Sequence, residues 1–80
     1  MTQMTDMGEA IGRARDEILT RLGELDAQNG AAPTPHALIH ELARDKNRYP
    51  YRAAMMSLIA SGIVERSSSW TIRLHSNRTA

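Results

Sequence analysis

Apolar residues recur every three or four positions over the first third of the chain, a spacing that predicts a long amphipathic helix. These positions are Met4, Met7, Ile11, Ala14, Ile18, Leu22 and Leu25. Asp6 and Glu9 have the spacing of a capping box, and the polar residues before Gly30 are typical of a helix end. Because two early glycines weaken the first turns, we expect a firm helix from about Glu9 to Gln28. Residues 1–8 are then a flexible segment or an extension of this helix.

A second, short helix is predicted from Pro35 to Arg44. Thr34 is a favoured N-cap residue, and proline suits the first helical position. The apolar residues Leu38, Ile39, Leu42 and Ala43 are expected to face inward by their spacing.

A third helix is predicted to start at Pro50 and to end near Ser61, before Gly62, which is a favoured C-cap. Spacing divides its residues into two faces. The expected inner face comprises Tyr51, Ala54, Met55, Leu58 and Ile59, and the outer face comprises Arg52, Ala53, Met56, Ser57 and Ala60.

After Gly62 the pattern changes from the period of a helix to that of a strand. Two β-prone runs, 63–67 and 70–75, are separated by serines and predict a hairpin. Trp70, Ile72 and Leu74 alternate onto one face, so we expect Trp70 to be the main aromatic residue of the core. The alternative is that its ring is a platform for stacking nucleic-acid bases. Residues 9–76 thus form one domain and 77–80 a flexible tail, and the predicted fold class is α+β, mainly α, with a three-helix core and a C-terminal β-hairpin.

The net charge of +1 hides an uneven distribution. Residues 1–43 hold three arginines against seven acidic residues, a net charge of −4. Residues 44–80 hold seven basic residues against two acidic ones, a net charge of +5. Such asymmetry indicates one side that faces an anion, although it also suits head-to-tail packing of like chains.

Composition narrows the function classes further. With 80 residues, no phenylalanine and one tryptophan, the chain is one small domain with a thin aliphatic core. It has no cysteine, which excludes disulfides and thiolate chemistry. The N-terminus has neither the charge pattern of a targeting peptide nor a run of the roughly 20 apolar residues that cross a membrane. We therefore expect a soluble cytoplasmic protein, nucleoid-associated if it binds DNA, with no membrane partner.

Candidate catalytic and metal-binding residues are few. His36 and His40 share a helical face and, with Glu41, suggest a metal site, but two exposed histidines are the favoured interpretation. The serines at 67–69 have only His75 nearby and no acid to orient it, and no glycine-rich phosphate loop is present. We predict no enzyme activity, no metal and no cofactor.

The order of elements resembles that of winged helix-turn-helix domains over about residues 9–75. The resemblance is carried by the segment LIHELARDKNRYPYRAAMMSLIASGIVER, followed by SSSWTIRLH. The stretch Leu58-Ile-Ala-Ser-Gly62-Ile63-Val64 matches the Leu-x-x-x-Gly-(Leu/Ile)-(Val/Ile) pattern at the end of that family's third helix. The resemblance implies that the protein is a transcriptional regulator or accessory factor that binds double-stranded DNA. The third helix (about 50–61) would enter the major groove and the wing (63–75) would contact the backbone.

The DNA-contacting residues follow from this resemblance and from electrostatics. Free N–H groups at the start of a helix attract phosphate, and an arginine one turn into the helix is placed to read guanine. The predicted DNA-binding residues are Lys46, Asn47, Arg48, Tyr49, Arg52, Arg66, Ser67, Ser68 and Arg73.

An alternative function follows from the apolar outer face of the third helix. Recognition helices commonly expose polar side chains, whereas this one exposes Ala53 and Met56 beside a single arginine. The Ala53/Met56 face and the N-terminal helix would then bind or inhibit a protein partner. The first turns of the N-terminal helix are either a homodimer interface or a frayed end. The predicted interaction residues are Met4, Met7, Ile11 and Met56.

Overall fold

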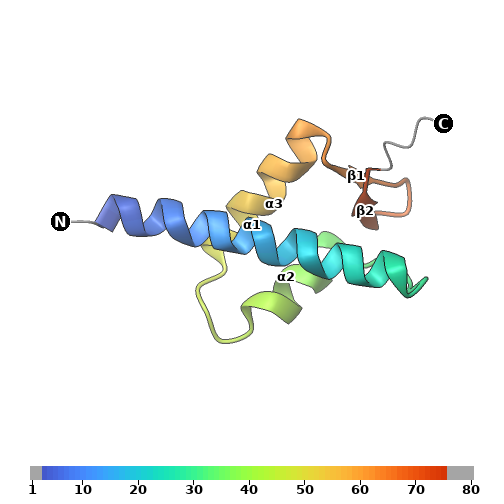
Figure 1. Ribbon diagram of the computed structural model, residues 1–80, viewed down its shortest axis with the longest axis horizontal. Helices are drawn as coiled ribbons and strands as arrows, with labels where there is room; N and C mark the ends of the chain where they lie inside the picture. The colour runs from blue at the N-terminus through green and yellow to red at the C-terminus, as the bar shows by residue number, and fades with distance from the viewer. Residues whose placement is uncertain (1–2, 76–80) are drawn as a thin grey trace.

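The computed structural model describes the backbone of residues 3–75 and the side chains of residues 7–75. Its elements are α1 (Gln3–Ala27), α2 (Pro35–Ala43), α3 (Tyr49–Ser61), β1 (Val64–Arg66) and β2 (Ile72–Leu74) (Figure 1). The α+β class, mainly helical with a C-terminal antiparallel hairpin, is confirmed. This order of elements is compatible with a winged-helix layout. Among the described residues no helix is long and apolar enough to cross a membrane.

The first helix starts earlier than its sequence pattern predicts. α1 begins at Gln3 rather than near Glu9, so Asp6 lies inside the helix and the capping-box interpretation was wrong. Each glycine weakens a helix by only about 1 kcal/mol, and the intervening residues are mostly good helix formers. The two glycines are therefore not enough to prevent helix formation in these turns. The side chain of Met4 and the predicted tail 77–80 lie outside the described residues.

The ends of the two short helices follow the predicted caps. The Thr34 backbone is extended (φ −84°, ψ 158°), and its hydroxyl oxygen accepts a hydrogen bond from the Ala37 N–H at 3.1 Å. α3 ends at Gly62, whose left-handed φ of 85° suits glycine. Both cap predictions are confirmed: Thr34 marks the start of α2, and Gly62 marks the end of α3, just before the hairpin.

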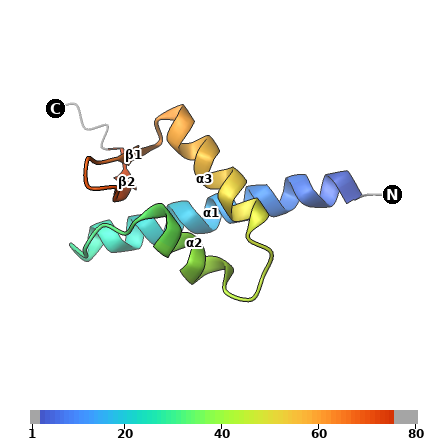
Figure 2. The ribbon, with the colours of Figure 1, turned by 180° about the vertical axis from the view of Figure 1, so that it is seen from behind.

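The core forms where α2 and α3 pack on the same side of α1. The long helix passes in front of both in Figure 1 and behind both in Figure 2. Each of α1, α2, α3 and β2 contributes to this core a side chain that is at most 1% exposed. These side chains are Ile18, Leu38, Leu58 and Ile72. The N-terminal turns of α1 project beyond the other elements in both views, and the molecule measures 47 Å along this direction.

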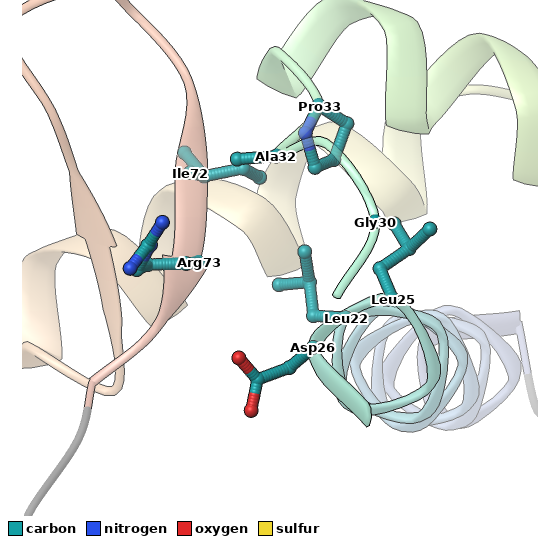
Figure 3. Close-up of a pocket in the computed structure, with 8 residues that line it drawn as sticks. All are labelled: Leu22, Leu25, Asp26, Gly30, Ala32, Pro33, Ile72 and Arg73. Atoms are coloured by element: carbon teal, nitrogen blue, oxygen red, sulfur yellow. The ribbon is translucent and has the colours of Figure 1, made fainter. Parts of the chain in front are cut away.

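The hairpin is tied to the helices through the linker that precedes α2. Its register pairs Val64 with Leu74 and Arg66 with Ile72. The Ile72 N–H, on the free edge of β2, donates to the Pro33 carbonyl at 2.8 Å. Figure 3 shows this junction, where Leu22 and Leu25 of α1 approach Pro33 and Ile72 around a hollow of about 30 Å³. A hollow of this size holds only water, so the junction is a packing contact rather than a ligand pocket.

The expectation that Trp70 belongs to the core was wrong. The residue is 65% exposed, and its φ is +66°. Strand β2 begins at Ile72, and the left-handed backbone at Trp70 breaks the alternation that would have placed its ring beside Ile72 and Leu74. Tyr51, only 5% exposed, is the aromatic residue of the core instead.

Candidate nucleic-acid interface

The outward face of α3 carries an open hollow beside the start of the helix. Its volume is about 590 Å³, and its lining mixes basic and apolar side chains. The lining residues are Asn47, Arg48, Tyr49, Arg52, Ala53 and Met56. Met56 is 71% exposed and Tyr49 57% exposed. The structure therefore brings four of the predicted DNA-contacting residues, though not Lys46, together with Met56, the apolar residue that the alternative function uses.

Two of the predicted residues in the turn before α3 make local bonds. The Asn47 side-chain oxygen accepts a hydrogen bond from the Tyr49 N–H at 3.0 Å, which satisfies one of the free donors at the helix start. The Lys46 ammonium donates to the Tyr51 hydroxyl at 3.4 Å, and that hydroxyl donates to the Glu17 carboxylate at 3.0 Å. Asn47 thus orders the start of α3 locally, whereas Lys46 is connected through Tyr51 to Glu17 of α1.

Arg48 is positioned by a histidine of α2. Its guanidinium donates to Nδ1 of His40 at 3.0 Å, which requires that this ring nitrogen carry no proton. A neighbouring hollow of about 390 Å³ between α2 and α3 is lined by His36, Ile39, Arg48 and Arg52. The two histidines, whose i, i+4 spacing suggested a metal site, therefore lie on the face of α2 that adjoins Arg48 and Arg52. Over the described residues, no three metal-ligating side chains come together.

The wing is closed by hydrogen bonds centred on Ser67. Its hydroxyl lies 2.8 Å from the Thr71 hydroxyl and 3.0 Å from that of Ser69, and it accepts from the Ser69 N–H at 3.2 Å. Ser68 is exposed between them. The Ser67 side chain was predicted to contact phosphate. In the structure its hydrogen bonds to Ser69 and Thr71 order the loop between β1 and β2.

The two arginines of the hairpin differ in their surroundings. The Arg66 guanidinium lies over the Trp70 ring, 5.0 Å from its centre. Arg73 stands opposite Glu65 in the register and, with Asp26 of α1, lines the hollow of Figure 3. Arg66 thus lies toward the tip of the wing, whereas Arg73 lies where the hairpin meets the end of α1.

Ion pairing separates the arginines of α1 from those of the predicted interface. Arg13 pairs with Glu9 at 3.7 Å, and Arg21 pairs with Glu24 at 3.3 Å and with Glu41 at 2.9 Å. Glu65 pairs with His75. Within residues 7–75, no carboxylate pairs with the predicted DNA-contacting arginines, which are Arg48, Arg52, Arg66 and Arg73. No carboxylate of the described residues therefore neutralises these four arginines.

The predicted interaction residues whose side chains are described lie on two helices, α1 and α3. Met7 is 36% exposed on α1, whereas Ile11 is partly buried against the core. Met56 lies on α3 among the basic residues of the large hollow.

Comparisons of this chain with family models, with curated proteins and with solved structures found no match. The geometry and charge of the site itself are therefore the basis for a function. That site combines exposed arginines at the start of α3 with an ordered hairpin.

Proposed function

We propose that this chain is a winged helix-turn-helix protein that binds double-stranded DNA, as a transcriptional regulator or an accessory factor. In this proposal α3 enters the major groove, and the wing contacts the backbone. The observation that carries it is that Arg48, Arg52, Arg66 and Arg73 are all exposed and pair with no carboxylate among the described side chains.

The dimensions of α3 support this placement. Thirteen residues make a helix about 20 Å long, and a helix with its side chains fits a major groove about 12 Å wide. Arg48 stands at its N-terminal end, where the positive end of the helix dipole also favours phosphate. Arg52 lies one turn further along the same face, in reach of base edges. The proposal therefore gives Arg48 a phosphate contact and Arg52 a base contact.

Substitution of these two arginines tests the proposal. We expect Arg48→Ala and Arg52→Ala each to weaken binding to duplex DNA about 5- to 150-fold, the effect of losing about 1–3 kcal/mol. The measurement is fluorescence anisotropy with a labelled mixed-sequence duplex at moderate salt. Arg15→Ala is the matched control, since Arg15 is an exposed arginine of α1 outside the proposed interface. Equal losses in all three variants would contradict the proposal, as would a wild-type chain that binds no DNA.

A second candidate function rests on the exposure of Met56. At 71% exposed, this side chain is the least buried of the exposed large hydrophobic residues that the structure describes. We propose as the alternative a protein-interaction module that uses the Ala53/Met56 face, with the N-terminal turns of α1 available for a homodimer. Met56→Glu distinguishes the two functions in the same anisotropy titration and by solution mass. Loss of self-association or of an isolated partner with unchanged DNA affinity favours the module, and a loss of DNA affinity alone counts against it.

A further inference from the structure

The wing tip carries the one tryptophan of the chain in an exposed position. Trp70 is 65% exposed although tryptophan is among the side chains that gain most from burial. The core is closed without it, since Val64 and Ile72 of the hairpin are each 1% exposed. The exposed ring is therefore not needed to close the core.

The backbone that presents this ring is held in an unfavourable conformation. A φ of +66° is uncommon for a residue other than glycine, and it costs free energy that the surrounding bonds must supply. The Trp70 N–H donates to the Ser67 carbonyl at 3.1 Å, and the Ser67 N–H donates to the Thr71 carbonyl at 2.8 Å. Conformations of this kind cluster at binding sites, where the fold fixes a side chain in place.

One face of the ring is already occupied by a cation. The Arg66 guanidinium lies 5.0 Å from the ring centre, a distance that allows cation–π attraction. With most of the residue exposed, the opposite face is open to solvent. No acidic residue occurs from position 66 to position 75, and Glu65 pairs with His75 away from the tip. The tip is thus a positively charged aromatic platform with one free face.

We propose that Trp70, backed by Arg66, is a stacking site for an unpaired DNA base. Every base has a π-face that an aromatic ring accepts, and a neighbouring guanidinium meets the adjacent phosphate. A base inside a duplex is already stacked on both faces, so only a terminal or single-stranded base is available. This inference rests on the proposed DNA-binding function. It adds that the chain prefers a duplex with a single-stranded extension to a blunt duplex.

The fluorescence of Trp70 reports on this site directly because the chain has no other tryptophan. The full chain is titrated with a blunt duplex and with the same duplex carrying an overhang of about six thymines, within the range of single-strand site sizes. We expect quenching by the overhang DNA and little by the blunt duplex. Trp70→Ala should lower affinity for the overhang DNA about 5- to 150-fold, to that of the blunt duplex, which itself changes less than about twofold. Trp70→Phe should retain part of the preference.

The outcomes separate this site from the proposed duplex binding. If wild-type chain binds both DNAs equally and Trp70→Ala leaves the ratio unchanged, the stacking site is overturned while duplex binding stands. If blunt duplex does not bind but overhang DNA still quenches, duplex binding fails and the stacking site stands. Circular dichroism of each variant confirms its fold, and Arg52→Ala, which should weaken both DNAs alike, is the matched control.

Discussion

Among single residues, Tyr51 links α1 with the turn before α3. It is 5% exposed, and its hydroxyl links Glu17 of α1 with Lys46 of the turn before α3. Burial is the main cause that raises the pKa of Tyr51 above its usual value of about 10, and the hydrogen bond to the Glu17 carboxylate adds to it. Both causes favour the neutral phenol in the folded protein.

Tyr51→Phe should therefore lower the free energy of unfolding by about 1.5–3 kcal/mol near neutral pH, the usual contribution of a hydrogen bond to a charged group. Because the folded pKa is raised, the contribution of the phenol to stability is complete below pH 10 and declines as pH rises through the folded pKa. Urea unfolding from pH 8 to pH 11 measures both effects. We expect the difference between wild type and Tyr51→Phe to shrink at the alkaline end. A difference that is constant or grows with pH would contradict the role of the neutral phenol.

The sequence predicts which polar residues lie at the start of α3, but it does not predict which hydrogen bonds each of them makes. Asn47 and Arg48 are adjacent polar residues that suit the same helix start. In the structure the first accepts a backbone N–H, whereas the second lies on the outer surface beside His40. Where each side chain points depends on the path of the turn and on the packing of α2 beside it. The spacing of residues in the sequence does not encode either of these.

At the scale of elements, the ends of helices follow local chemistry, whereas the wing depends on tertiary structure. Thr34 and Gly62 act as the predicted caps because each cap is satisfied within its own few residues. The start of β2 depends instead on the five-residue loop 67–71, where Ser67 bonds reach across to Thr71. This loop, rather than strand alternation, sets the direction of Trp70.

Two glycines provide a matched test of this distinction. No atom lies within 4 Å of a Cβ added at Gly62 or at Gly12, so only the backbone distinguishes them. Gly62→Ala should destabilise the chain by about 1–2 kcal/mol because its φ of 85° strains any L-residue. Gly12→Ala, inside α1, should stabilise it by about 0.5–1 kcal/mol. Thermal unfolding compares the two, and shifts of the same sign would contradict the assigned cap.

At the scale of the whole molecule, charge asymmetry in the sequence becomes a division between surfaces. Over residues 7–75, three of the four acidic residues that form ion pairs do so with arginines of α1, whereas Arg52 of α3 and the arginines of the wing are exposed. The sum over each half of the sequence predicts this polarity because neighbouring residues stay together in so short a chain. The charge sum does not predict that Trp70 is exposed beside Arg66, because the position of the Trp70 ring follows from the geometry of the wing.

The central claim is that the exposed arginines bind the phosphates of duplex DNA, and the salt dependence of binding tests it most directly. Wild-type chain is titrated with blunt duplex at several salt concentrations, beside Arg48→Ala and Arg15→Ala. Counterion release predicts that log Kd rises linearly with log salt, with a slope that falls by about 1 in Arg48→Ala and is unchanged in Arg15→Ala. Binding that is absent at low salt, or that does not change with salt, would contradict the account.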